Sequence, residues 1–452
     1  MSTARKPRRQ ASIPHTRPAG ATSGTAGEIA AATSPVEKAA KILGPGFITG
    51  ASDDDPSGIG TYAVAGASLG LQTLWTALLT FPLMAAVQNI CARLGMVSGR
   101  GLAGVLREYY PRPVLYAAVA LLFVANSINV GADLGAVADA VHVLAGVPAG
   151  WLLVPVALGI LALQIFGSYR LIANVFKWLT LALLAYVVDA VIVRPDLGET
   201  LRATVVPTLT LDPTYITAVV AILGTTISPY LFFWQSSEEV EEEIDKGRKS
   251  VAARKGATPA EIHYSTIDVN VGMAFSNAVM YFIILATAIT LFKAGKTDIK
   301  SAADAAEALK PVAGDLAGVL FGVGMIGAGV LAVPILSGSA AYAIAEAFGW
   351  RHGLDRHWRH AKPFYGVIAV ATLVGVAMNF LGVNAIDALF YAALLNGVVA
   401  PPLLVLVMLA ARNRRVMGEK RIGPVLTTLG WLATGAMFLA LAGLVYAVVT
   451  GR

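Results

Sequence analysis

The sequence predicts an all-α integral membrane protein of eleven transmembrane helices, and three observations support this fold class. Of the 452 residues, 56% are hydrophobic and only 14% are charged, against about 25% charged in soluble domains, and the mean hydropathy is +0.68. Apolar runs suited to helices of about 20 residues recur along the chain, without the alternating pattern of an outer-membrane barrel. Two of these runs are interrupted by proline and polar residues, which indicates helices broken inside the membrane.

The chain divides into a polar N-terminal tail and a transmembrane domain. Residues 1–38 are rich in Ala, Ser, Thr, Pro and Arg and carry no apolar stretch, so we expect a disordered, basic cytoplasmic tail. Residues 39–452 form the transmembrane domain, in which residues 301–310 are expected to form a short surface helix. The eleven apolar segments are expected over 42–69, 73–97, 114–142, 150–168, 171–193, 215–242, 264–292, 313–347, 364–382, 385–411 and 425–450.

Basic residues in the loops predict the orientation. Lys and Arg gather after segments two, six, eight and ten, whereas the loops after segments one, three and nine carry almost none. The positive-inside rule therefore predicts a multi-pass protein of the cytoplasmic membrane with the N-terminus in the cytoplasm and the C-terminus outside. Because the net charge of +6 belongs to these loops, no nucleic-acid partner is expected. The single cysteine, Cys91, excludes disulfides within the chain and thiolate metal clusters.

The first interruption is the run of residues 53–58, DDDPSG, inside segment one. Each carboxylate costs about 2.5–3.5 kcal/mol at the bilayer centre, and Pro56 disfavours a helix at Asp55. A break there frees backbone carbonyls, which together with acidic side chains indicate a cation site. A loop with a capping aspartate is the alternative, which the evenly apolar flanks disfavour. Asp53 and Asp54 are expected either to line the ion pathway or, for one of them, to cap the second half-helix.

The second interruption lies in segment six, where residues 224–235 read GTTISPYLFFWQ. Pro229 breaks this helix, and Thr225 and Ser228 offer hydroxyl and carbonyl oxygens; a simple proline kink is the alternative. Segments one and six are corresponding members of two five-helix sets, 1–5 and 6–10. Because each set has an odd number of helices, the two sets lie in opposite orientations in the membrane. Broken helices at matching positions indicate a transport site between inverted repeats.

These motifs resemble those of a known family. Residues 55–58 resemble the Asp-Pro-Gly-Asn motif of the Nramp divalent-metal transporters, and residues 228–230 resemble their Met-Pro-His motif. The likeness covers roughly residues 40–450. Further matches are residues 88–100 (QNICARLGMVSGR), Asp133 in Gly-Ala-Asp-Leu-Gly, Asp268 with Asn277, and residues 337–339 with Glu346. The resemblance implies a leucine-transporter-type inverted repeat, and the sequence looks most like the Nramp-related magnesium transporters.

The resemblance implies a metal site at Asp55, Gly58, Thr225 and Ser228. Only Asp55 keeps the family's residue, because the Asn ligand falls on Gly58, the Met ligand on Ser228 and the carbonyl-donating Ala on Thr225. Without the thioether the donors are hard oxygens, which suit magnesium, calcium or manganese. The smaller side chains leave room for water, so we expect partly hydrated Mg²⁺ ahead of Mn²⁺ as the transported substrate, and no cofactor.

Proton coupling is not expected to be strict. Asp133 is kept, but the family's two segment-six histidines fall on Tyr230 and Gln235, which do not shuttle protons near neutral pH. The membrane potential can drive the uptake of a doubly charged ion instead. Asn396 in segment ten is expected either to support the site or to bond to another helix.

Two alternatives stay open, and both are transporters. The first is a proton-coupled Mn²⁺ or Fe²⁺ symporter of the Nramp type. The second is a sodium-coupled amino-acid symporter of the same fold, in which three aspartates would repel the substrate carboxylate. No Ser/His/Asp set, phosphate loop or zinc spacing with His is present, so the protein is not expected to be an enzyme. We expect a monomer in the lipid bilayer.

Overall fold

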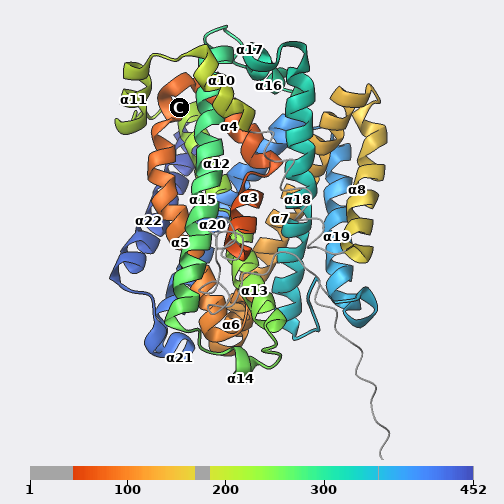
Figure 1. The fold of residues 1–452 in the computed structure, drawn as a ribbon, viewed down its shortest axis with the longest axis vertical. Coiled ribbons are helices and arrows are strands. Elements are labelled where there is room, and N and C mark those ends of the chain that lie inside the picture. The colour runs from red at the N-terminus through yellow and green to blue at the C-terminus, as the bar shows by residue number, and fades with distance from the viewer. Residues whose placement is uncertain (1–43, 168–183, 355, 451–452) are drawn as a thin grey trace, which may run out of the picture.

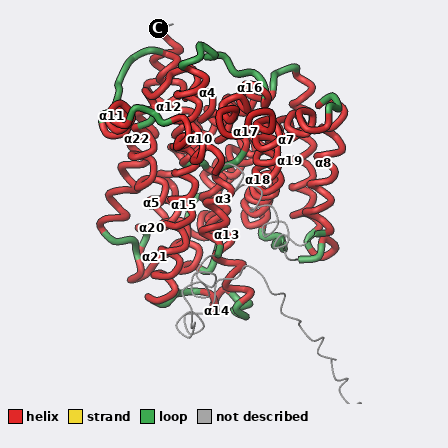
Figure 2. The backbone as a smooth tube through the Cα atoms, turned by 45° about the horizontal axis from the view of Figure 1, so that its top comes forward, coloured by secondary structure: helices red, strands yellow, loops and turns green. Residues whose placement is uncertain are grey.

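The structure, a computed structural model, describes residues 44–167, 184–354 and 356–450. The predicted tail, residues 1–38, and most of segment five lie outside the described residues. Every described element is helical, as Figure 2 shows. Nine helical stretches in these ranges are long and apolar enough to cross a membrane. Segment one adds a tenth as two shorter helices, and the described part of segment five is α10 (Ala185–Val193).

Apart from segment five, the predicted segments agree with the observed helices to within a few residues. The long helices are α5 (Trp75–Ser98), α7 (Arg112–Ala145), α8 (Ala149–Phe166), α15 (Pro259–Thr287, continued by a π-helical turn over Ala288–Phe292), α18 (Ala317–Phe348), α19 (Lys362–Met378), α20 (Ala385–Arg412) and α22 (Pro424–Thr450). Shorter helices are α6 (Leu102–Tyr109), α11 (Leu197–Val205), α14 (Val251–Arg254), α16 (Ala302–Ala306), α17 (Lys310–Ala313) and α21 (Arg414–Met417). The surface helix expected over 301–310 is confirmed as α16 and the 3-10 turn Glu307–Leu309 that follows it.

Both predicted helix breaks are present. Segment one consists of α3 (Pro45–Asp53) and α4 (Pro56–Leu69), and segment six consists of α12 (Pro213–Thr226) and α13 (Pro229–Asp245). Each second half begins with proline, whose missing N–H costs nothing at the first helical position. Two positions before these prolines the chain leaves the helical region, with φ −82° and ψ 52° at Asp54 and φ −117° and ψ 56° at Ile227.

The packing of the helices follows the predicted repeat. Half-helix α4 packs on α15, the second helix of the second repeat, and half-helix α13 packs on α5, the second helix of the first repeat. The third helices of the two repeats, α7 and α18, pack along each other. Figure 1 shows α3 at the centre of the bundle with α13 below it, and the residues of both breaks are buried. This reciprocal packing is what two inverted repeats produce around a central site.

The basic loops gather at one end of the bundle. In Figure 1, α6, α14 and α21, which follow segments two, six and ten, lie at the lower end. Helices α11, α16 and α17 and the C-terminus lie at the upper end. The lower end is therefore the one to which the positive-inside rule assigns the cytoplasm.

Candidate metal site

Asp55 begins the second half of the first broken helix. Its Oδ1 accepts hydrogen bonds from the backbone N–H of Gly58 at 2.6 Å and from the hydroxyl of Ser57 at 2.8 Å, which makes Asp55 the N-cap of α4. Its Oδ2 faces α13, where the Tyr230 hydroxyl lies at 3.5 Å. The carboxylate thus holds the helix end with one oxygen and directs the other toward the second broken helix.

Gly58 and Thr225 meet beside this carboxylate. A Cβ atom placed on Gly58 would lie 3.1 Å from Thr225 Oγ1 and 3.4 Å from Asp55 Oδ1. Thr225 Oγ1 is buried and lies beside the Tyr62 hydroxyl, and neither oxygen has another hydrogen-bond partner. The structure therefore brings three of the four predicted ligand positions together, with a buried hydroxyl among them.

Ser228, the fourth predicted ligand position, lies in the second break. Its hydroxyl lies 2.6 Å from the carbonyl oxygen of Thr225 and 3.0 Å from that of Gly224, both at the end of α12, and can donate to one of them at a time. At the first break, the Tyr230 hydroxyl donates to the carbonyl oxygen of Ser52, near the end of α3, at 3.0 Å. Both half-helix ends thus present carbonyl oxygens at the breaks, and each such oxygen keeps a second lone pair.

Asp133 reaches the cluster from α7. Its side chain is fully buried, no side chain donates a hydrogen bond to its carboxylate, and the backbone N–H of Ser57 faces it. Asp55 is the charged group that acts on it electrostatically. A buried carboxylate without a basic partner costs several kcal/mol. The Asp55–Asp133 pair is therefore an arrangement that a cation would stabilise.

Asp53 and Asp54 both face α15. Both are buried, and the Ser276 hydroxyl lies 2.8 Å from Asp53 Oδ2 and 3.2 Å from Asp54 Oδ1. The suggestion that one of them caps α4 is wrong, because the residue directly before Pro56 occupies the N-cap. Sequence reasoning missed Ser276, since a single serine in an apolar helix carries no recognisable signal.

Two of the predicted supporting residues lie outside the cluster. Gln235 donates from Nε2 to Glu239 Oε1 at 3.0 Å, further along α13 toward the basic end. Asn396 of α20 and Asn129 of α7 exchange amide hydrogen bonds of 3.0 and 3.1 Å. For Asn396, the structure therefore supports the helix-to-helix alternative.

The ligands of this site are not all acidic. No three His, Cys, Asp or Glu side chains of residues 44–167, 184–354 and 356–450 come together as a ligand set. A metal ion here needs hydroxyls, carbonyls and water in addition to carboxylate. All four aspartates are at most 1% exposed, so in this state the site is closed to both sides.

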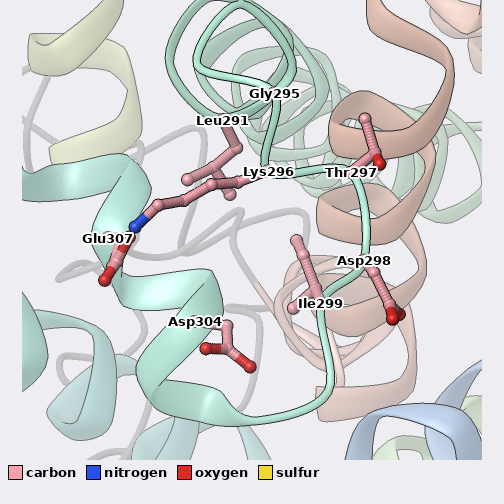
Figure 3. Close-up of a pocket in the computed structure, with 8 residues that line it drawn as sticks. All are labelled: Leu291, Gly295, Lys296, Thr297, Asp298, Ile299, Asp304 and Glu307. Carbon is pink, nitrogen blue, oxygen red and sulfur yellow. Dashed lines mark hydrogen bonds and ion pairs between the residues drawn. The ribbon is translucent and has the colours of Figure 1, made fainter.

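A separate cavity of 360 Å³ lies in the loop between α15 and α16, as Figure 3 shows. Its Glu307 carboxylate is paired with Lys296 and Lys310, and hydrogen bonds from the two ammonium groups lower the pKa of Glu307. Asp298 pairs with Lys300, and Asp304 caps α16. Because these carboxylates already have partners, the cavity is a poorer cation site than the buried aspartates.

Comparison with known proteins gives a consistent picture. The family described as natural resistance-associated macrophage protein-like (Nramp) matches residues 46–447. The divalent metal cation transporter MntH of Aeromonas hydrophila is 25% identical over 396 residues, 86% of this chain and 92% of the relative. The MntH of Deinococcus radiodurans is 27% identical over 412 residues, 90% of each chain.

Solved structures share the fold. A crystal structure of the Eremococcus coleocola manganese transporter matches with a TM-score of 0.72 at 18% identity, over 89% of this chain and 86% of that one. Mhp1, a nucleobase-cation-symport-1 family transporter, matches with a TM-score of 0.57 at 14% identity, over 90% of this chain and 93% of that one. These likenesses confirm the predicted fold class. Because the family match extends over nearly all of the transmembrane domain, the chain belongs to the Nramp family, whose members are membrane transporters and not enzymes.

Proposed function

We propose that this protein transports a divalent metal cation, bound between its two broken helices with Asp55 as the ionic ligand. The observation that carries the proposal is the convergence of the Asp55 carboxylate and the buried Thr225 hydroxyl on Gly58, where an added Cβ would touch both. The buried Asp133 carboxyl group, which has no basic partner, adds a second acidic oxygen donor. Relatives named divalent metal cation transporters support this class of cargo.

The donors favour Mg²⁺ as the cargo. Carboxylate, hydroxyl, carbonyl and water are hard oxygen ligands, and neither Ser228 nor Gly58 supplies the softer or bulkier donor of the family pattern. Mg²⁺ keeps several waters when it binds, which fits a site with few acidic ligands. Mn²⁺ is the second candidate, because it accepts the same donors and a structural relative is named a manganese transporter.

The helix ends contribute to binding. Helices α3 and α12 both end at the breaks, so the negative ends of their dipoles face the proposed ion, and their terminal carbonyl oxygens each keep a lone pair for it. At α4 the positive end is occupied by the capping carboxylate oxygen of Asp55. An ion at this place would therefore be held by one carboxylate oxygen and by neutral oxygens of both repeats, with water completing its shell.

Transport requires movement, because the site is closed in this state. Half-helix α3 is fastened to α15 by Asp268, whose carboxylate accepts backbone hydrogen bonds from Gly44, Gly46 and Phe47 at 2.8, 2.7 and 3.0 Å. The two backbones also approach closely at Gly50 and at Gly272, which pack against each other's helix. Opening of the site toward the basic end would therefore either break the contact between α3 and α15 or move these two helices as one unit.

We further propose that the ion enters the cell without strict proton coupling. Tyr230 and Gln235 stand where the family pattern has histidine, and both side chains are engaged, Tyr230 with Ser52 and Gln235 with Glu239. Moving two charges through 100 mV supplies about 4.6 kcal/mol, twice the single-charge figure, which suffices to accumulate the ion. The basic end is proposed to face the cytoplasm, with residues 1–38 as a tail on that side. A monomer suffices, since the whole site lies within one chain.

Uptake by purified protein in liposomes tests this function. With an inside-negative potential and equal concentrations of Mg²⁺, Mn²⁺ and Ca²⁺ in competition, Mg²⁺ entry is expected to exceed the other two. Asp133→Asn should reduce uptake strongly, whereas Asp139→Asn, the same change on the same helix outside the cluster, should leave it near wild type. Equal loss of uptake in both variants would contradict the proposed site. Absence of metal uptake by the wild-type protein would contradict the proposed function.

A further inference from the structure

The carboxylates of Asp53 and Asp54 converge on the single hydroxyl of Ser276. A hydroxyl carries one proton and donates to one acceptor at a time, so it cannot satisfy both carboxylates. The remaining oxygens, Asp53 Oδ1 and Asp54 Oδ2, are buried and have no hydrogen-bond partner. Both side chains are at most 1% exposed. The Asp53–Asp54 pair therefore lacks a cation or a second hydrogen-bond donor that would stabilise its remaining oxygens.

A buried phenol borders this pair. Tyr62 of α4 is fully buried, and its hydroxyl has no hydrogen-bond partner other than the Thr225 hydroxyl beside it. Of the three carboxylates of the break that act electrostatically on this phenol, Asp53 acts most strongly. Two carboxylates and two hydroxyls thus gather from α3, α4 and α15, and each of the two carboxylates carries a buried oxygen that lacks a partner.

This group adjoins the Asp55 position through Tyr62, which lies beside Thr225, but its carboxylates face a different helix. Asp55 is engaged with the N-terminus of α4 and faces Tyr230 of α13, whereas Asp53 and Asp54 are engaged with Ser276 of α15. The C-terminal end of α3 also directs its partial negative charge toward this region. One break in the helix therefore offers acidic oxygens toward two different helices.

We propose that Asp53, Asp54, Ser276 and Tyr62 form a second cation position, which takes the same divalent ion with part of its water shell. This inference rests on the proposed function, because it takes the ion bound at Asp55 as its reference. Hard oxygen donors suit such an ion. Two ions at neighbouring positions repel each other, so the second ion weakens the hold on the first and promotes its release, as in multi-ion pathways.

Counting bound ions tests the second position. Full-length protein in lipid nanodiscs is equilibrated with Mn²⁺ as the probe, and bound ions are counted by equilibrium dialysis and by electron paramagnetic resonance. Wild-type protein is expected to bind two ions whose signals broaden each other. The double variant Asp53→Asn/Asp54→Asn should bind one ion, and Asp55→Asn should also retain one.

Two serine variants on α15 provide a matched comparison. Ser276→Ala should weaken binding of one of the two ions about tenfold, the lower limit for loss of a supporting group around a metal. Ser265→Ala, the same change at a serine that donates to Glu239, should leave both ions unaffected.

The outcomes separate the two proposals. A single ion in wild-type protein that persists in the double variant would overturn the second position and leave Asp55 as the site. Wild-type protein that binds no Mn²⁺ would overturn the proposed function as well. If the double variant does not fold, Ser276→Ala decides, because unchanged affinity for both ions in that variant would equally overturn the second position.

Discussion

Asp55 is both a helix cap and the proposed metal ligand, and two substitutions separate these roles. Asparagine at position 55 can still accept the Gly58 N–H, since Asn and Asp are equally good N-caps, but it removes the negative charge. Alanine removes both the charge and the cap. We therefore expect Asp55→Asn and Asp55→Ala to abolish metal uptake alike, while only the alanine variant loses the capping energy.

The size of the difference follows from the cap. Replacing an N-cap Asp or Asn by Ala costs about 0.5–2 kcal/mol, and the Asp55 cap is well formed, with the backbone bond of 2.6 Å and a second bond from Ser57. The free energy of unfolding of Asp55→Ala should therefore lie about 1–2 kcal/mol below that of Asp55→Asn. Both variants lose the favourable interaction with the α4 dipole, so this contribution cancels in the comparison.

Thermal unfolding of the purified variants and metal uptake in liposomes measure the two roles independently. Asp139→Asn serves as the control for a carboxylate-to-amide change outside the cluster. Uptake by Asp55→Asn at the wild-type rate would refute the role of Asp55 as ionic ligand. Equal unfolding temperatures of the Asn and Ala variants would show that the cap does not contribute to stability.

Three further predictions address coupling, selectivity and packing. Metal entry should not acidify the liposome interior, and stoichiometric acidification reported by a pH dye would restore the proton-coupled alternative. Gly58→Asn combined with Ser228→Met should shift preference toward Cd²⁺ in competition uptake, because sulfur favours soft ions and the larger side chains displace water; a wild type that already prefers Cd²⁺ would contradict the hard-site argument. Gly50→Ala should lower the free energy of unfolding by about 1–3 kcal/mol, because its Cβ would lie 2.2 Å from the backbone carbon of Gly272. Gly366→Ala, where a Cβ meets open space, is the control and should leave the unfolding temperature unchanged or raise it slightly.

The fold was largely predictable because its main determinants are local. Hydropathy over about 20 residues marks each membrane helix without reference to any other. Pro56 and Pro229 predict the two breaks because a proline removes a backbone donor and restricts the residue before it, wherever the chain is placed. Matching breaks in two five-helix sets then predict the repeat, which the solved structures confirm.

The site was predictable only in part. The sequence singled out Asp55, Gly58 and Thr225, and the structure brings them together. It did not reveal that Asp55 is the cap, nor that Gln235 bonds to Glu239 within α13. Those contacts depend on the directions of side chains around a break, where the regular helical spacing no longer applies.

The sequence by itself determined the membrane class, the positions of the two broken helices and the acidic character of the first break. Only the tertiary structure decided which way each aspartate faces. Asp53 and Asp54 meet Ser276, more than 200 positions away in the chain, because α3 packs on α15. The physical reason is that charge and hydropathy act on each segment separately, whereas a hydrogen bond needs two groups within about 3 Å of each other, and only the packing of helices from the two repeats brings such groups together.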